Sequence, residues 1–397
     1  MTQFMPSPLG LYIHVPFCSA ICNYCNFNRG LFDEGLKARY VVALATEIER
    51  AGKAGAGRAG KGPEDAESVH EGERADTIYF GGGTPSLLEP AEIGRVIDAC
   101  ARQFDVTPDA EISLEANPES VNERRLVGFR EAGVNRLSFG VQSFRDPELR
   151  RLSRLHTADR AAAAVAEARA AGFDNVSLDL MMWLPGQQVP EWLESVDCAI
   201  TLNPDHLSLY LLELYPNAPL KEEMARANWS QAPDADAAAM YLTAMERLDG
   251  VGYRQYEISN VARVGRQSRH NLKYWQDGEW MGFGCGAHST RQAVRWRNVA
   301  STEEYVQRLS AGESPAVDHQ WRADADRLGD ALFTGLRLTD GVNLDAIRAT
   351  YGVDVWDRYG SQLEPFLQTG MLRRYAGRIF LTREGMLLAH EVMSIFV

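Results

Sequence analysis

Six short apolar runs alternate with longer amphipathic segments along the first half of the chain. The runs have the length and residue types of strands, and they cover residues 11–15, 77–80, 111–116, 136–142, 176–183 and 206–214. Between them, apolar residues recur at helical spacing, which predicts helices over residues 36–52, 91–104 and 160–172. Several runs are apolar on both faces, as in parallel strands that helices cover. The pattern predicts an α/β fold with a (β/α) barrel. A closed barrel of this kind has eight units and only six are visible here, so we expect the barrel to be open.

The pattern becomes mostly helical from about residue 320. Helices are predicted near residues 322–336, 343–350 and 355–369, before a hairpin at 371–385 and a final helix. Helices followed by a small β-wing resemble a winged-helix module. Its one basic cluster is Arg373, Arg374 and Arg378, so a structural or partner-docking wing is favoured over a DNA-reading one.

These changes divide the chain into three predicted parts. Residues 1–230 form the partial barrel, residues 231–319 extend it through a helix and an aromatic, glycine-rich stretch, and residues 320–397 form the C-terminal domain. Within the barrel, residues 52–75 are rich in Gly, Ala and charged side chains and lack apolar periodicity. We expect these residues to form an exposed, mobile insertion rather than a functional arm.

The composition is that of an ordinary globular protein, with 45% hydrophobic and 24% charged residues among 397. A formal net charge of −13 argues against nucleic acid or an anionic membrane as the main partner. The N-terminus lacks the basic and apolar regions of a signal peptide, and no run of ~18 apolar residues predicts a transmembrane helix. The six cysteines, half of them clustered, are unlike a secreted disulfide scaffold. We therefore expect a cytoplasmic protein with reduced thiols and at most transient membrane contact through a partner.

Three of those cysteines, Cys18, Cys22 and Cys25, follow the first predicted strand in a C-x3-C-x2-C spacing. A disulfide needs two cysteines and a closed tetrahedral zinc site needs four ligands, so three thiols match neither. A [4Fe–4S] cluster ordinarily takes four thiolates, and three would leave one iron open to a small molecule. The alternative for these residues is a zinc site that takes His14 as an added ligand.

Other small or polar residues fall at the ends of the predicted strands, where a barrel places its active site. They are the GGGTP turn after the second strand, Glu115 in the third, Gln142 after the fourth and Asp179 in the fifth. Each has an ordinary alternative, because a glycine turn can simply join a strand to a helix and a single carboxylate can simply end a strand. Their shared position on one face of the barrel favours a site.

With the cysteine triplet after the first strand and GGGTP after the second, the chain resembles the radical S-adenosylmethionine (SAM) superfamily. The resemblance implies a [4Fe–4S] cluster on three cysteines, with SAM on the open iron and reductive cleavage of its sulfonium. It also implies SAM-binding positions, which here are Tyr12, Tyr24, Gly82, Gly83, Thr84, Glu115, Gln142, Arg154 and Asp179. Charged and amide groups suit a ligand that carries a sulfonium, a carboxylate and ribose hydroxyls.

Seven segments spread over most of the chain resemble the HemN-like branch: LYIHVPFC, IYFGGGTPS, SLEANPES, RLSFGVQSF, LPGQ, RHNLKYW and GFGCGAHS. That branch contains oxygen-independent coproporphyrinogen III oxidase and the HemW-type haem chaperones. The oxidase has a fourth cysteine where this chain has Phe27, and a long extension before its cluster, whereas 17 residues precede Cys18 here. Both differences imply the chaperone type. Trp183 stands where the branch commonly has glycine, which leaves the finer shape of the pocket open.

The segment H-N-x-x-Y-W, at residues 270–275, is shared with the chaperone type, where it is associated with haem binding. An imidazole can ligate haem iron, and aromatic rings offer flat surfaces to a porphyrin. The resemblance therefore makes His270 the candidate haem ligand, with Cys285 and His288 as secondary candidates. Without the resemblance, a lone histidine is more often a hydrogen-bonded structural residue.

The resemblance thus implies a chaperone that binds haem, the cluster and SAM, and that passes haem to an acceptor protein, such as a respiratory haem protein. The sequence leaves open whether SAM cleavage also makes it an enzyme. One alternative is porphyrinogen decarboxylation, as in the oxidase. Others are radical methylation, which would not need the H-N-x-x-Y-W segment, and a nucleic-acid-binding regulator, against which the negative charge argues.

Overall fold

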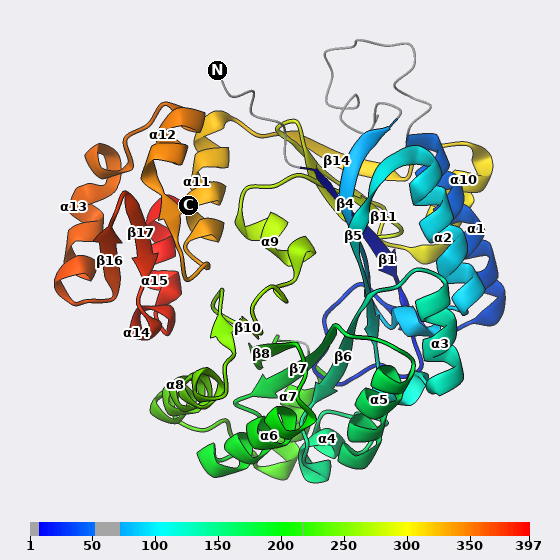
Figure 1. The fold of residues 1–397 in the computed structure, drawn as a ribbon, viewed down its shortest axis with the longest axis horizontal. Coiled ribbons are helices and arrows are strands. Elements are labelled where there is room, and N and C mark those ends of the chain that lie inside the picture. The colour runs from blue at the N-terminus through cyan, green and yellow to red at the C-terminus, as the bar shows by residue number, and fades with distance from the viewer. Residues whose placement is uncertain (1–7, 52–71, 217) are drawn as a thin grey trace.

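One long curved sheet runs through the computed structural model, which describes residues 8–51, 72–216 and 218–397 (Figure 1). The sheet has 12 strands in the order β14-β13-β12-β11-β1-β4-β5-β6-β7-β8-β10-β9. Its parallel centre follows the order of the chain: β1 (Leu9–Val15), β4 (Glu73–Gly82), β5 (Phe104–Ala116), β6 (Arg136–Gln142), β7 (Val176–Met182) and β8 (His206–Leu211). The α/β class and the six predicted strands of the open barrel are confirmed.

Helices cover the convex side of this sheet (Figure 1). They are α1 (Glu34–Ala51), α2 (Pro90–Gln103), α3 (Glu123–Glu131), α4 (Asp146–Arg151), α5 (Ala158–Ala170) and α6 (Val189–Leu202), with α7 (Pro219–Ala227) and α8 (Asp234–Gly250) after the last parallel strand. The start of α2 shows why the segments fold locally as they do. Pro90 fills the first turn, and Glu89 and Glu92 form a capping box that satisfies free backbone N–H groups.

The concave face of the sheet is polar, although the sequence predicted several strands with two apolar faces. In β5, Ile112 and Leu114 join the buried hydrophobic core, whereas Glu111, Ser113 and Glu115 alternate with them. Successive side chains of a strand point to opposite faces, so these three polar residues share the inner face. The inside of the barrel is therefore built to hold polar groups.

The sheet continues beyond β1 through four strands that the sequence did not predict. They are β11 (Trp280–Phe283), β12 (His288–Arg291), β13 (Val294–Asn298) and β14 (Ala316–Trp321), of which β11 runs parallel to β1 and the others are antiparallel. The far edge of the sheet ends in β10 (Asn260–Ala262) and β9 (Arg254–Gln255). Helix α10 (Thr302–Ala311) packs on α1.

The segment H-N-x-x-Y-W forms a short helix, α9 (Arg269–Trp275), on the concave side of the sheet (Figure 1). Its first backbone N–H groups, those of Arg269 and His270, donate to the Glu111 carboxylate on β5. Lys273 pairs with Asp76 on β4 at 2.7 Å. These contacts fix α9 inside the open barrel.

The predicted insertion at residues 52–75 is in large part outside the described residues, which resume at residue 72. The structure does correct its end, because β4 begins at Glu73 rather than after residue 75. The charged start of this strand is stabilised by an ion pair of 2.6 Å between Glu73 and the buried Arg291 on β12.

The C-terminal part has the helices and wing that the sequence predicted. It contains α11 (Asp324–Gly335), β15 (Val342–Asn343), α12 (Leu344–Tyr351), α13 (Val355–Gln368), β16 (Leu372–Tyr375), β17 (Arg378–Leu381), α14 (Arg383–Met386) and α15 (Ala389–Met393). The three short strands pair in the order β15-β17-β16. No helix within the described ranges is both long and apolar enough to cross a membrane.

Candidate functional site

The three clustered cysteines lie on a loop that is closed at its base by a two-stranded ribbon. Its strands β2 (Phe17–Cys18) and β3 (Gly30–Leu31) pair in parallel, and the Phe32 N–H donates to the Cys18 carbonyl at 2.9 Å. Inside the loop, the Cys25 N–H donates to the Cys22 carbonyl at 3.2 Å. The local turn and the ribbon together hold the cysteines over the end of β1.

A cavity of about 390 Å³, here called the cluster cavity, opens at the carboxyl ends of the parallel strands. Of the residues predicted to hold the cluster or SAM, all except Tyr12 line it, namely Cys18, Cys22, Cys25, Tyr24, Gly82, Gly83, Thr84, Glu115, Gln142, Arg154 and Asp179. Its size falls within the usual range for a small-molecule site. The structure therefore gathers residues from the cysteine loop and from β4, β5, β6 and β7 around one space.

The thiols differ in their surroundings. The Thr84 hydroxyl donates to the buried Cys18 Sγ at 3.7 Å, and Arg154 Nη1 donates to Cys22 Sγ at 3.4 Å. Burial raises the pKa of Cys18 and of Cys25. Among the described residues, no three His, Cys, Asp or Glu side chains are gathered closely enough to hold a single metal ion. The cysteines thus share a cavity without sharing a single-ion site, and a [4Fe–4S] cube would bind each thiolate at a separate iron.

The glycine turn after β4 is packed tightly against the cysteine loop. Gly82 has φ +117°, a conformation that favours glycine, and an added Cβ would lie 2.6 Å from the His14 ring. A Cβ on Gly83 would lie 2.7 Å from the Phe17 carbonyl oxygen. The N–H groups of Gly83 and Thr84 donate to the Val15 and Phe17 carbonyls. The packing of the turn against His14 and Phe17 is therefore enough to explain why residues 82 and 83 are glycine, whether or not the turn also binds a ligand.

Two half-buried carboxyl groups face the cluster cavity, one from β5 and one from β7. Glu115 accepts from the Tyr79 hydroxyl at 2.8 Å and from the Gly82 N–H at 3.2 Å, and burial raises its pKa to about 7. Asp179 accepts from the Ser138 hydroxyl at 3.2 Å, and burial also raises its pKa. A cationic ligand would favour the charged form of both groups.

Gln142 and Arg154 keep hydrogen-bonding capacity at the wall of the cavity. Gln142 has φ +69°, and its buried Oε1 has no partner among the described residues. Arg154 Nη2 donates to Asn117 Oδ1 at 2.6 Å and to the Gly140 carbonyl at 2.7 Å, while its Nε is buried without a partner in the same described part of the chain. Buried polar groups are normally hydrogen-bonded, so these atoms indicate a place for a polar ligand.

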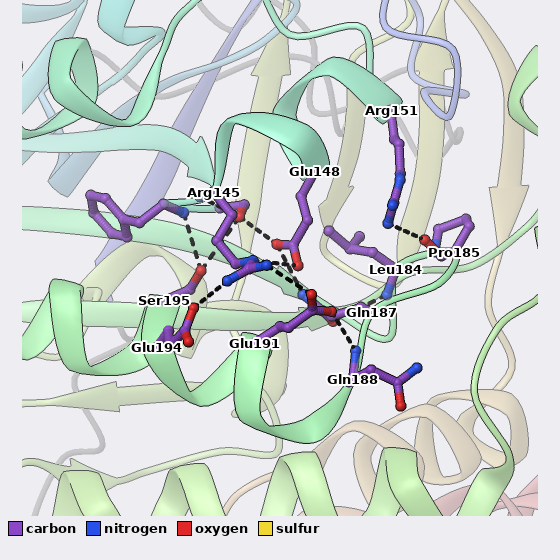
Figure 2. Close-up of polar contacts among 12 residues, drawn as sticks. Arg145, Glu148, Arg151, Leu184, Pro185, Gln187, Gln188, Glu191, Glu194 and Ser195 are labelled. Carbon is purple, nitrogen blue, oxygen red and sulfur yellow. Dashed lines mark hydrogen bonds and ion pairs between the residues drawn. The ribbon is translucent and has the colours of Figure 1, made fainter.

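The cysteine loop is anchored from the side by α4, which in turn contacts the turn before α6. The Asn23 amide donates to the Arg151 carbonyl at 2.8 Å. Arg151 Nη1 donates to the Pro185 carbonyl at 2.8 Å (Figure 2). Beneath them, Gln187 donates to the buried Glu148 at 3.2 Å. The polar network in Figure 2 therefore supports the cavity rather than forming part of it.

The sequence did not predict several further residues of the cluster cavity. Asn117, Ser138, Tyr210, Met181, Tyr215 and Phe27 all line it. A signal existed for two of them, because Asn117 directly follows β5 and Tyr210 lies near the end of β8, the positions where this fold collects its ligands.

The predicted SAM contact Tyr12 and the predicted haem candidates His270, Cys285 and His288 do not line the cluster cavity. Tyr12 lines a second, neighbouring cavity, and its hydroxyl donates to His14 Nδ1 at 3.1 Å. His270, on α9, is buried, and its ring nitrogens hydrogen-bond the Thr77 hydroxyl at 2.8 Å and the Tyr274 hydroxyl at 2.9 Å. Burial lowers the pKa of His270 to about 3, so the ring is neutral. Neither nitrogen is free to meet a ligand in this conformation.

Comparison with known proteins agrees with this geometry. The family model of the Radical SAM superfamily matches residues 12–199, and that of the HemN C-terminal domain matches residues 323–388. The haem chaperone HemW of Bacillus subtilis is 33% identical over 97% of this chain and 98% of its own. The haem chaperone HemW of Mycobacterium tuberculosis is 37% identical over 97% of this chain and 94% of its own.

Among solved structures, coproporphyrinogen III oxidase (HemN) from Escherichia coli, described as a radical SAM enzyme, is similar over the whole length. It covers 100% of this chain and 91% of its own, with a TM-score of 0.82 and 23% sequence identity. At that identity the likeness shows the fold alone.

Proposed function

The chain belongs to the HemW family of haem chaperones within the radical SAM superfamily, and we propose that it binds haem and delivers it to a respiratory haem protein from the cytoplasm. Radical SAM proteins use a [4Fe–4S] cluster and SAM, so the chain has three groups to hold: the cluster, SAM and the haem that it carries.

The cluster cavity suits the first two groups. We assign the cluster to Cys18, Cys22 and Cys25, and SAM to the surrounding residues Tyr24, Gly82, Gly83, Thr84, Glu115, Gln142, Arg154 and Asp179. The unpartnered Gln142 Oε1 can accept from a ligand hydroxyl or ammonium group, and the two protonatable carboxyls can balance a sulfonium. When bound, the cluster supplies the electron for SAM cleavage.

One observation carries the chaperone function. Phe27 occupies the position of a possible fourth cysteine and lies in the wall between the cluster cavity and a second cavity lined by Tyr12, Tyr274 and Trp280. Its side chain is 64% exposed, although a phenylalanine in a soluble fold is usually buried. An exposed aromatic ring beside an aromatic cavity supports a flat apolar cargo rather than another cluster ligand.

The test is haem loading followed by transfer. The full-length chain, reconstituted anaerobically, should hold about four iron and four sulfide ions and take up haem to saturation. The haem-loaded chain should transfer its haem to a purified b-type apocytochrome. This transfer should be faster than transfer to the same apocytochrome from an unrelated haem carrier such as serum albumin. Absence of saturable haem binding would overturn the proposal. Incubation with coproporphyrinogen III, SAM and a reductant should leave the porphyrinogen unchanged, and enzymatic conversion to protoporphyrinogen would favour the oxidase instead.

A further inference from the structure

The second cavity, here called the aromatic cavity, has a volume of about 590 Å³ and opens beside the cluster cavity. Tyr12, Tyr274 and Trp280 supply its aromatic wall, and Phe27 and Glu115 line both cavities. The Tyr274 and Trp280 rings pack edge to face with centroids 4.7 Å apart. A cavity of this size with rigid aromatic walls fits a flat organic ligand.

One histidine of this cavity has no hydrogen bond to its ring within the part of the chain that the structure describes. Four histidines in the described ranges are buried with both ring nitrogens hydrogen-bonded: His14, His156, His206 and His270. His288 lines the aromatic cavity from the start of β12, is exposed, and has no hydrogen bond to its ring within the described part of the chain. His319 and His390 do not line the cavity. His288 is therefore placed to offer a ring nitrogen to a ligand.

The segment that carries His288 is held in place against the cysteine loop. The Asn28 amide, next to Phe27, donates to the Cys285 carbonyl at 3.1 Å and to the Ala300 carbonyl at 3.1 Å. Gly286 has φ +71°, and a Cβ there would collide with the Asn28 amide. On the other side, Trp280 Nε1 donates to the His288 carbonyl at 3.0 Å. The aromatic wall and the histidine are thus fixed relative to each other before any ligand arrives.

We infer that haem binds in the aromatic cavity with its iron ligated by His288, while His270 positions the Tyr274 ring from behind. The inference rests on the proposed haem function and names the site for it. Neutral imidazole is a common axial ligand of haem iron, and the aromatic rings match the porphyrin faces. It differs from direct ligation by His270, whose two nitrogens are already engaged.

One further observation agrees with this assignment. His288 pairs directly with Arg297 across β12 and β13, so their side chains share one face of the sheet. Arg297 Nε donates to Asp318 at 2.7 Å, and the other N–H groups of the guanidinium can meet a carboxylate of the haem, which carries two.

His270 acts on this site through Tyr274. Its Nε2 lies 2.9 Å from the Tyr274 hydroxyl, and the two rings pack edge to face at 5.3 Å. Without His270, the Tyr274 ring would lose the contact that orients it against the porphyrin. Loss of His270 would therefore weaken haem binding without changing the atoms bound to the iron.

The experiment compares His288→Ala, His270→Ala and the control His390→Ala, which changes an exposed histidine on α15. Each full-length variant is reconstituted with its cluster and titrated with ferric haem, and electron paramagnetic resonance reports the axial ligands. His288→Ala should lose the histidine signature and bind haem at least about tenfold more weakly. Free imidazole should restore that signature, because it can enter the space that the side chain leaves.

The other variants complete the test. His270→Ala should bind haem more weakly but keep the wild-type axial signature, and His390→Ala should match the wild type in both readouts. Loss of the signature in His270→Ala, with His288→Ala unchanged, would overturn the inference while leaving the haem function intact. Failure of the wild-type chain to bind haem would instead overturn the proposed function.

Discussion

The cluster cavity and the aromatic cavity meet along one wall but are built from different parts of the chain. The cluster cavity collects its residues from the ends of successive parallel strands and from one loop, residues 18–29. The aromatic cavity joins β1 to α9, β11 and β12, which follow β1 by more than 250 residues in sequence. The first carries the three cysteines and the charged side chains at the strand ends, and the second carries the rings of Tyr12, Tyr274 and Trp280.

This difference shows how one barrel can serve two ligands. The strand ends supply charged and polar groups for a small polar ligand, and β1, α9 and β11 supply aromatic rings for a second ligand. Phe27 and Glu115 line both cavities, so the two sites are neighbours. The three cysteines line only the cluster cavity and His288 lines only the aromatic cavity, so each site can be altered by itself. The following substitutions test that separation, beginning with the largest expected effect.

Cys18→Ala should abolish the cluster while leaving haem binding measurable. The Cys18 thiol is buried beside Thr84 at the floor of the cluster cavity, and a cluster on two thiolates would be poorly held. Iron and sulfide analysis after anaerobic reconstitution should fall from about four of each to near zero. The control is Cys198→Ala, an exposed cysteine on α6, which should keep the full content. Equal iron content in both variants would refute the assignment of the cluster to this loop.

Gly83→Ala should destabilise the fold and weaken SAM binding. The new Cβ would lie 2.7 Å from the Phe17 carbonyl, so the turn after β4 must move away from the cysteine loop. Overpacking of this kind costs about 3 kcal/mol or less in the free energy of unfolding.

Gly94→Ala is the matched control for that change. Gly94 lies inside α2, and a Cβ there would meet the Ala132 side chain at an ordinary distance of 3.6 Å. It should raise the free energy of unfolding by about 0.5–1 kcal/mol, because alanine is the better helix residue. Chemical denaturation measures both variants, and equal destabilisation would show that the turn is not packed as described.

Glu115→Gln should remove a pH dependence that reaches both cavities. Burial raises the folded-state pKa of Glu115 to about 7, above the roughly 4.3 of an unfolded chain. A raised carboxyl pKa stabilises the fold at low pH, and that stabilisation is lost as the pH rises towards 7. Between pH 5.5 and pH 8 the wild type should therefore lose about 2 kcal/mol relative to Glu115→Gln. Denaturation midpoints at both pH values measure this, and parallel curves for the two proteins would contradict a raised pKa.

The cluster cavity was predictable because its determinants are local. Alternating strands and helices gave the barrel, and parallel strands end at one face, so Glu115, Gln142 and Asp179 were expected together. The spacing of Cys18, Cys22 and Cys25 within eight residues specified their loop in the same way. Tyr12 was expected there as well, yet β1 turns its ring towards the aromatic cavity.

The aromatic cavity was not predictable because it depends on contacts distant in sequence. β11 is a four-residue strand interrupted by Gly282, too short to show alternation, and it becomes a strand by pairing with β1. Helix α9 forms where Glu111, about 160 residues away, accepts from the N–H groups of its first turn. The sequence ranked His288 below His270 as a haem ligand, and the opposite ranking that we infer follows from this assembly, which engages both ring nitrogens of His270 and, among the described residues, neither of those of His288.

Phe27→Ala should have the smallest effect, and it tests most directly whether the haem site is separate from the cluster site. The ring is 64% exposed, so its removal leaves the free energy of unfolding nearly unchanged. Bound haem would cover the ring, and losing that contact should cost about 1 kcal/mol, which is roughly a fivefold weaker affinity. The matched control is Leu31→Ala, on the same loop and 62% exposed but lining neither cavity, which should bind haem as the wild type does. Iron and sulfide content should stay the same in both variants.

A loss of cluster iron in Phe27→Ala would contradict this assignment. It would mean that residue 27, the position of the absent fourth cysteine, stabilises the cluster rather than the bound haem.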